Sequence, residues 1–496
     1  MSQPFVIIPI VLWLVWSEQN SPRARTDWFM IGLLGAVIFS FILMMRAWSR
    51  LTLRSFGSDD FERSSRRFGW SLLTMRFLIV AGFALALFGF GYGDAITKLL
   101  EPLENNGLRL PGLVLGTAPI FLAMIGLWWA AYPVERGHRE AQAQELMDNN
   151  LPVHMPPSVG RFLWLNVRMQ LLVTATPVFA GLMVSDVASA VLKQFGLQAG
   201  PALNLLLFLI TLAVVFVLSP WLLTKVLDAD RMPDTPLRRR LETLAERLNV
   251  RCRDVLIWRT GHGVGNAMVV GLVPRMRYIL LTDLLLDTLS DRQIEAVFAH
   301  EVGHIRHRHI AWYLVMIASL LIALSGPIAW LTEYIHAHVN LSPDATSFIV
   351  GLPVFILFII AFGIVSRLFE RQADAFAART MQSSEFEPAL EPTSLAVESS
   401  GADAFSSALK RVAQINHMPL SDPPRGRTLF KRLRQKLIRQ FAHFRHPSVA
   451  RRVEAVHHLA RHPDHSARFD RLVAITMILL LALMVVLAGI TLAAYL

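Results

Sequence analysis

The segment HEVGH, residues 300–304, holds the side chains with the clearest capacity for chemistry. It places His300 and His304 four positions apart, so on a helix both imidazoles leave one face about one turn apart and can bind one ion. A hydrolytic zinc site needs three protein ligands and an open fourth position, where the ion lowers the pKa of a bound water to about 7. Glu301 projects beside that position and is the candidate general base. So short a motif also arises by chance in a chain with 16 histidines, so a third ligand is the next requirement.

A second helical segment, SRLFERQAD at residues 366–374, supplies that third ligand. Glu370 can complete a His₂Glu zinc site, because zinc accepts carboxylate oxygen beside imidazole nitrogen. Asp374 lies one turn further and can accept the second N–H of a ligating histidine, which fixes the tautomer of that histidine. The alternative is a surface helix in which both carboxylates pair with Arg367 and Arg371, and the HEVGH segment favours the metal site.

His307 and His309 follow the motif closely. His307 is three positions from His304 but lies nearer the membrane end, so we do not expect it to bind the catalytic ion. The remaining histidines, including His336 and His457, have no convincing partner spacing, and we expect them to be surface or interfacial residues.

The elements that position these residues are mostly hydrophobic helices. The chain is 54% hydrophobic, with a mean hydropathy of +0.45. A bilayer core about 30 Å thick needs roughly 20 apolar residues per helix. Eight such stretches lie near residues 28–45, 71–92, 111–132, 170–189, 202–223, 310–332, 347–367 and 472–495. A shorter run, Phe5 to Trp16, lacks the basic flank of a signal peptide, and we expect a tilted first helix there, which leaves eight or nine spans.

The net charge of +11 reflects topology rather than nucleic-acid binding. Arginine is concentrated in alternate loops, as at residues 46–67 and 136–168, while the connection at 333–346 has no Lys or Arg. The positive-inside rule then places residues 226–308 and 368–471 on the cytoplasmic side. A single cysteine, Cys252, cannot form an intramolecular disulfide, which fits that side of the membrane.

These patterns predict a mainly α-helical polytopic membrane protein with a small α+β zincin-like metalloprotease domain at the cytoplasmic face. The expected parts are N-terminal membrane helices (1–225), a first catalytic part with the HEVGH helix (226–309), two membrane helices (310–367), a second catalytic part with the Glu ligand (368–471) and a last membrane helix (472–496).

Within the first catalytic part, DVLIW and RYILLTD read as short strands, and GVGNAMVVGLVP between them reads as an irregular edge strand. Ser290 and Gln293 form a capping-box pattern at the start of the HEVGH helix. We expect this helix to pass with little break into the span that begins near Ile310. In the second catalytic part, residues 381–403 read as a loop or insertion, and residues 425–441 read as a basic helix on lipid headgroups or as a solvated face.

Together these motifs resemble the integral-membrane zinc metallopeptidase family of the bacterial HtpX protease and the type I CAAX prenyl proteases. The resemblance spans about residues 235–460 and is carried by HEVGH, SRLFERQAD, GNAMVVG and HPSVARRVEAV. It implies zinc coordination by His300, His304 and Glu370, with Asp374 in a supporting role.

The resemblance also implies residues that contact substrate. Asn266, Ala267 and Met268 correspond to the segment that holds the substrate backbone as an added strand, which an edge strand does with little regard for side chains. His446 and Arg452 correspond to a histidine and an arginine that approach the active site, where they would contact substrate or the developing oxyanion. Without the resemblance, Pro447 would simply begin a helix that carries Arg452 on its surface.

We therefore expect a zinc metalloendopeptidase with one Zn²⁺ per chain, embedded in the inner membrane of a bacterium. Its partners would be the lipid bilayer and membrane-associated or misfolded proteins or peptides, cleaved at the cytoplasmic face, with no nucleic acid. One alternative is a CAAX-type processing protease for lipid-modified peptides. Another is a non-catalytic transporter or scaffold that contains a metal, although few ionisable residues interrupt the spans. The sequence leaves the oligomeric state open.

Overall fold

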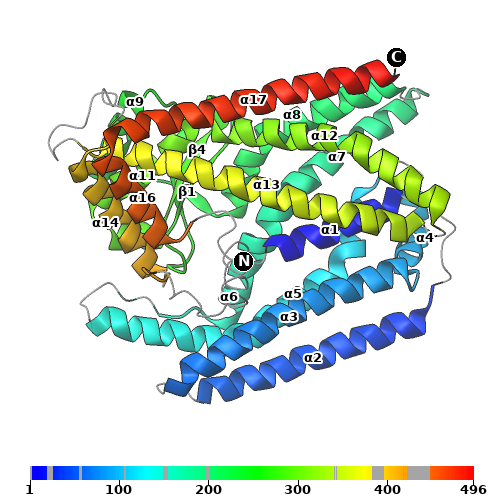
Figure 1. Ribbon diagram of the computed structural model, residues 1–496. Helices are drawn as coiled ribbons and strands as arrows, with labels where there is room; N and C mark the ends of the chain where they lie inside the picture. Colours follow the sequence, from blue (N-terminus) through cyan, green and yellow to red (C-terminus); the bar gives the residue numbers. More distant parts are fainter. Residues whose placement is uncertain are drawn as a thin grey trace. The chain divides into compact units, whose positions relative to one another are not determined.

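A computed structural model describes residues 3–18, 26–54, 59–104, 108–148, 153, 155–196, 200–339, 341, 343–382, 396–416, 418–421 and 447–495. The chain divides into two compact units, Met1–Ala229 and Asp230–Leu496. Both are dominated by helices, and a small sheet accompanies the helices of the second (Figure 1).

The first unit consists of helices. They are α1 (Gln3–Glu18), α2 (Trp28–Arg54), α3 (Asp59–Phe88), α4 (Tyr92–Glu104), α5 (Leu110–Asp148), α6 (Val159–Asn166), the π-helix η1 (Val167–Leu172), α7 (Val173–Gln194) and α8 (Pro201–Val226). The α6, η1 and α7 segments follow one another without a break, so they form one long apolar stretch.

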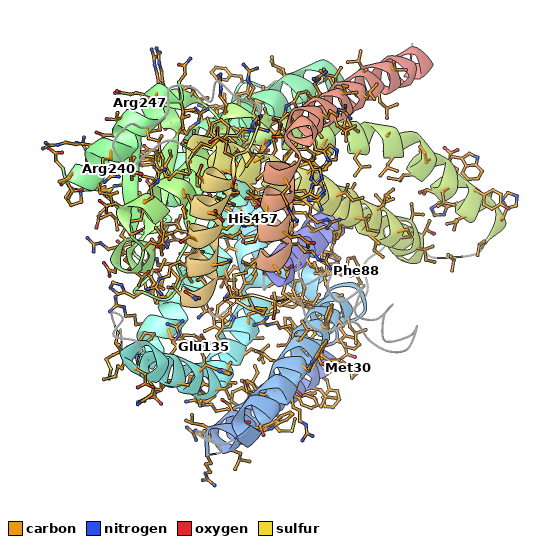
Figure 2. The ribbon with its side chains drawn as sticks, turned by 60° about the vertical axis from the view of Figure 1, so that its left-hand side comes forward. Met30, Phe88, Glu135, Arg240, Arg247 and His457 are labelled. Carbon is orange, nitrogen blue, oxygen red and sulfur yellow. The ribbon has the colours of Figure 1, made fainter. Side chains whose placement is uncertain are left out.

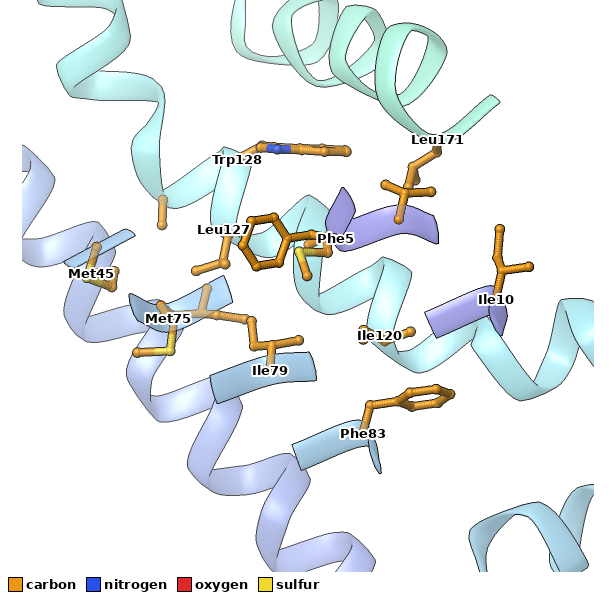
Figure 3. Close-up of a cluster of buried hydrophobic side chains, with 14 of the residues drawn as sticks. Phe5, Ile10, Met45, Met75, Ile79, Phe83, Ile120, Leu127, Trp128 and Leu171 are labelled. Atoms are coloured by element: carbon orange, nitrogen blue, oxygen red, sulfur yellow. The ribbon is translucent and has the colours of Figure 1, made fainter. Parts of the chain in front are cut away.

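The core of this unit lies where α1, α2, α3, α5 and η1 meet (Figure 3). Phe5 and Ile10 of α1 are buried in it together with Ile79 of α3 and Leu127 of α5. The run at residues 5–16 thus forms a helix with a buried face, and its apolar stretch, Phe5–Ser17, is among the shorter apolar helices of the chain.

Five helical stretches within the described residues are long and apolar enough to cross a membrane. They are Trp28–Arg54, Arg67–Phe88, Leu110–Ala141, Val159–Gln194 and Ile349–Thr380. Each contains or overlaps one of the eight expected spans, and the other three expected spans fall within helices α8, α12 and α17. The expected fold class, a mainly helical polytopic membrane protein with a small sheet, is confirmed. The side on which each loop lies stays a prediction.

The second unit contains a four-stranded sheet with the order β1-β2-β4-β3. Its strands are β1 (Ala229–Arg231), β2 (Asp254–Trp258), β3 (Ala267–Val270) and β4 (Tyr278–Thr282). β2 runs parallel to β4 and β3 antiparallel to it. DVLIW and RYILLTD therefore form β2 and β4 as expected, and GNAMVVG supplies β3 at one edge of the sheet.

Helices complete this unit. They are α9 (Pro236–Arg247), the 3₁₀ turn η2 (Pro274–Met276), α10 (Asp283–Thr288), α11 (Asp291–Arg306), α12 (His309–His338), α13 (Pro343–Thr380), α14 (Ser399–Ile415), α16 (Val449–Arg461) and α17 (Pro463–Tyr495).

Side-chain contacts join several of these helices. Arg240 on α9 forms an ion pair with Glu295 on α11 at 2.7 Å, and His457 on α16 contacts Ser406 on α14 at 3.2 Å. Figure 2 labels Arg240 and His457. The 425–441 segment and most of 381–403 lie outside the described residues.

The expectation of a nearly continuous helix from HEVGH into the next span is wrong. α11 ends at Arg306, and α12 begins at His309. Arg308 between them has φ 55°, in the left-handed region that a helix cannot continue through. The break lets α12 leave in a new direction, with the ring of His309 beside that of His304.

Candidate metal centre

The helix that carries HEVGH is firmly started. Ser290 accepts a hydrogen bond from the backbone N–H of Gln293, and the Gln293 side chain accepts one from the backbone N–H of Ser290, which completes the expected capping box. Phe298 and Val302 are fully buried in the core of the second unit. The cap fixes where α11 starts, and the buried side chains fix its rotation about its axis. The face that carries His300 and His304 is therefore held in one orientation.

Gly303 allows α11 and α13 to approach closely. A Cβ atom at this position would lie 3.1 Å from the Cα of Ala373 and 3.2 Å from the Phe376 ring. Ala373 lies between Glu370 and Asp374 on α13, so this contact sets how near the two carboxylates come to the histidines.

Gly303→Ala is expected to push α13 away from α11. The overpacking should lower the free energy of unfolding by about 1–3 kcal/mol and weaken metal binding by the converging side chains as well. Thermal unfolding and chelator competition on the purified protein measure the two effects. Gly326→Ala on α12 is the matched control, because a Cβ atom at that position would meet nothing within 4 Å. Equal behaviour of the two variants would contradict the role given to the close approach.

Two imidazoles and one carboxylate converge between α11 and α13. His300 Nε2 lies 3.3 Å from His304 Nε2. Glu370 Oε2 lies 3.7 Å from His300 Nε2, and Glu370 Oε1 lies 3.7 Å from His304 Nε2. Among the described residues, this is the one group of three or more His, Cys, Asp or Glu side chains with ligand atoms close enough to share a metal ion.

Asp374 and Arg452 support this group from behind. His300 Nδ1 lies 3.0 Å from Asp374 Oδ1, so Nδ1 carries a proton for the carboxylate and Nε2 is left with a lone pair. Arg452 of α16 binds both oxygens of Asp374, at 2.9 and 2.5 Å, and its Nη1 lies 3.6 Å from Glu370 Oε2. Asp374 is 1% exposed, so its negative charge depends on this guanidinium.

Electrostatics in the site follow from these contacts. Burial lowers the pKa of the Arg452 guanidinium, but Asp374 and Glu370 raise it more, so Arg452 remains charged. Burial also lowers the pKa of His300, and the hydrogen bond to Asp374 raises that pKa above its ordinary value. A proton therefore competes with a metal ion for His300. The Asp374 carboxylate favours both, because it stabilises the positive charge that either one brings to the imidazole.

The donor set fits a divalent metal. Bonds of about 2.0–2.2 Å to a tetrahedral ion require ligand atoms about 3.3–3.6 Å apart. The two Nε2 atoms are 3.3 Å apart, each lies 3.7 Å from one of the two Glu370 oxygens, and one ligand atom from each of the three residues lies within 4.8 Å of the others. Two imidazole lone pairs and a carboxylate would repel one another around that point, and a cation removes the repulsion. His₂Glu is a set that zinc takes in hydrolytic sites.

Glu301 lies beside the edge of the sheet. Its Oε2 accepts a hydrogen bond of 3.1 Å from the backbone N–H of Val269 on β3. The residue that follows the first histidine of HEVGH is thus held against the strand next to the metal group, where a general base would be needed.

The edge strand is itself pinned at its start. Asp283 accepts hydrogen bonds from the backbone N–H groups of Gly261 and His262. Burial raises the pKa of its carboxyl group, but hydrogen bonds from the Thr260 hydroxyl and the His262 N–H lower that pKa more. Asn416, after α14, accepts from the N–H of Gly265 and donates to its carbonyl. The loop that leads into β3 is therefore fixed from two directions.

The register of β3 decides which of its groups face outward. Asn266 pairs with Thr282, because its carbonyl accepts from the Thr282 N–H at 3.0 Å. Hydrogen-bonded pairs alternate in an antiparallel ladder, so Met268 also faces β4, while Ala267 and Val269 turn their polar groups to the open edge. Of the three residues expected to hold substrate, Ala267 thus offers backbone groups there, and Val269 joins it.

The structure brings most of the expected site residues together. His300, His304, Glu370, Asp374 and Arg452 form one cluster, whereas His446 lies outside the described residues. The roles assigned to them stay predictions. Val269 was missed because the ladder register is not visible in sequence. His309 also enters the cluster, since its Nδ1 lies 2.8 Å from His304 Nδ1.

Comparison with known proteins places the chain in a class. Residues 231–476 match the profile of Peptidase family M48. The chain is 28% identical over 171 residues to a CAAX prenyl protease 1 homolog of Arabidopsis thaliana, covering 32% of this chain and 40% of that protein. It is 29% identical over 147 residues to a Protease HtpX homolog of Pyrobaculum islandicum, covering 29% and 40%. The crystal structure of S. mikatae Ste24p aligns with 87% of this chain and 100% of its own, with a TM-score of 0.47 and 16% identity.

The matched residues 231–476 include His300, His304 and Glu370 of the converging group. Through residues 231–476, just under half of its length, the chain is similar to peptidase family M48. It spans 40% of the length of each of the two curated relatives named above.

Proposed function

We propose that the protein is a zinc-dependent endopeptidase of the membrane, which hydrolyses membrane-associated or misfolded proteins at the cytoplasmic face. The observation that supports it most is the convergence of His300, His304 and Glu370 beside Glu301 and the open edge of β3. The similarity to peptidase family M48 supports the reaction class, and the apolar helices support the membrane setting.

In the proposed mechanism, His300, His304 and Glu370 would hold one zinc ion per chain. The bound ion would supply Lewis acidity at the scissile carbonyl. The Glu301 carboxylate takes a proton from the attacking water and later delivers it to the leaving amine. When substrate enters, the carboxylate must give up its hydrogen bond from the Val269 N–H, and that N–H is then available to the peptide.

The open edge of β3 would hold the substrate as an added strand. Ala267 and Val269 present backbone groups that pair with any extended peptide, so binding depends little on substrate side chains. Asn266 has an exposed side chain and can contact the substrate beyond this ladder. Such binding suits an unfolded segment of a protein, because a folded segment has already paired its backbone.

Arg452 and His446 remain candidates for contacts with substrate. Arg452 forms hydrogen bonds to Asp374 and lies near Glu370. Its positive charge therefore neutralises the two buried carboxylates. His446 comes directly before Pro447, and α16, which carries Arg452, begins at Val449. We propose that both act on the charge that develops at the scissile carbonyl.

A processing protease for lipid-modified peptides is the alternative within the same chemistry. It is supported by the name of the Arabidopsis relative, which is a CAAX prenyl protease 1 homolog. A metal-containing transporter has less support, because two buried ionisable groups of the first unit, Arg168 and Asp186, cap helix ends. Arg168 donates to the carbonyls of Val226 and Leu227, and Asp186 accepts from the N–H of Leu110.

The function is tested by metal removal. Purified protein in detergent should cleave an unfolded, fluorescently labelled casein, lose that activity on dialysis against a chelator, and regain it with about one equivalent of Zn²⁺ but not with Mg²⁺. A farnesylated C-terminal peptide cleaved in strong preference to casein would favour the processing alternative. Full activity after complete metal removal would refute the proposal.

A further inference from the structure

A chain of hydrogen bonds leads from the metal group to the last helix of the protein. His304 Nδ1 lies 2.8 Å from His309 Nδ1, and His309 Nε2 lies 3.0 Å from Gln372 Oε1. Gln372 Nε2 in turn donates to Asp470 Oδ1 on α17 at 3.1 Å. Three helices, α12, α13 and α17, thus meet behind one candidate ligand of α11.

The proton positions in this series of hydrogen bonds follow from the carboxylate of Asp470. A carboxylate can only accept, so the amide nitrogen of Gln372 must face Asp470 and the amide oxygen must face His309. That oxygen requires a proton on His309 Nε2, and a neutral imidazole then has a lone pair at Nδ1. His304 must therefore carry its own proton on Nδ1 to donate to His309.

The consequence for His304 is a bare Nε2, which is the atom that lies 3.7 Å from Glu370 Oε1. We propose that Asp470, Gln372 and His309 are positioning residues that fix the tautomer and ring orientation of His304 for metal binding. The inference rests on the proposed metal site and extends it by three residues outside HEVGH and Glu370. His300 has its own support in Asp374, so each candidate histidine ligand is oriented by a separate partner.

The surroundings hold these groups in place. The His309 ring is 1% exposed and stacks on Phe369 with ring centroids 4.1 Å apart and planes at 5°. Asp470 Oδ2 accepts from the buried Arg379 at 2.7 Å, and Arg379 also binds Ser466 one turn earlier on α17. The carboxylate is therefore held by a cation on one side and by the Gln372 amide on the other.

Two substitutions separate hydrogen bonding from packing. His309→Phe keeps a ring that can stack on Phe369 but removes the acceptor for His304. We expect zinc affinity, measured by chelator competition at fixed pH, to fall about 10–100-fold. His309→Asn offers an oxygen near the position of Nδ1 and should recover part of this loss. Gln372→Met should weaken affinity like His309→Phe, because it removes the acceptor for His309 Nε2 and the donor to Asp470.

His307→Phe is the matched control. Its ring stacks against His309 with ring centroids 5.7 Å apart, but His307 is not one of the three residues whose ligand atoms converge, so zinc affinity should not change. The melting temperature of the metal-free protein is the second readout, because a purely structural role would lower it in His309→Phe without a selective loss of zinc affinity. The Co²⁺-loaded variants provide a third, since a displaced His304 changes the visible absorption of the ion.

The outcomes distinguish this inference from the function on which it rests. If Glu370→Ala weakens zinc binding and His309→Phe does not, the positioning role of His309, Gln372 and Asp470 is wrong, whereas the metal site stands. If neither variant changes zinc affinity, the metal site itself is wrong. Equal zinc affinities of His309→Phe and His309→Asn would also overturn this positioning role, because an acceptor for His304 Nδ1 would then make no difference.

Discussion

Glu301→Gln should abolish proteolysis while zinc stays bound. The amide keeps the size of the side chain and can still accept from the Val269 N–H through its oxygen, so the strand contact persists. It cannot take a proton from water. Loss of a general base costs typically 10²–10⁴-fold, so kcat/KM for a casein-derived peptide should fall within about that range.

Zinc content is the control for this variant, because Glu301 is not among the three converging ligand atoms. Elemental analysis should give the same metal content as for the unmodified protein. Glu246→Gln, at an exposed position on α9, should keep full activity. Full activity in Glu301→Gln would remove this residue from the mechanism, and loss of metal together with activity would make it a structural residue of the site.

Glu370→Ala should weaken zinc binding by more than about 100-fold, which exceeds the usual effect of removing a group that only supports a ligand. Two neutral imidazoles would remain, and Arg452 would lose one of its two carboxylate neighbours, which leaves more uncompensated positive charge next to the ion. The result is a site with both fewer donors and a repulsive neighbour. Chelator competition and residual proteolysis measure the effect.

An exposed carboxylate provides the comparison for this second variant. Glu246→Ala on α9 should bind zinc as the unmodified protein does, since its side chain is far along the chain from HEVGH and exposed. Because a buried charge is removed, the melting temperature of metal-free Glu370→Ala should be recorded as well. Unchanged zinc affinity in a folded Glu370→Ala variant would show that the third ligand is a different residue.

Much of the site could be predicted because its information is local. HEVGH and SRLFERQAD each place two functional groups one helical turn apart, and helical spacing is visible in sequence. Long apolar runs likewise identified the membrane helices, and the short segments DVLIW and RYILLTD identified β2 and β4. That the two helical segments meet was an inference from zinc chemistry, and Gly303 is the residue that makes the approach possible.

The remaining features depend on the path of the backbone. The break at Arg308 was not foreseen, because a left-handed arginine has no sequence signature and the apolar run continues beyond it. Without that break His309 would point elsewhere on a continuous helix, five residues from His304. Gln372 and Asp470 are 98 residues apart, so their contact appears only when α13 and α17 pack. The outward direction of Ala267 and Val269 needs the register with β4.

The central claim is that His300, His304 and Glu370 share one zinc ion. Anomalous scattering at the zinc edge, from crystals of the protein purified without chelators, tests it most directly. The account predicts one strong peak per chain, about 2.0–2.2 Å from His300 Nε2, His304 Nε2 and a carboxylate oxygen of Glu370. A peak at other residues, or a Glu370 carboxylate turned away from both rings around a bound ion, would contradict it.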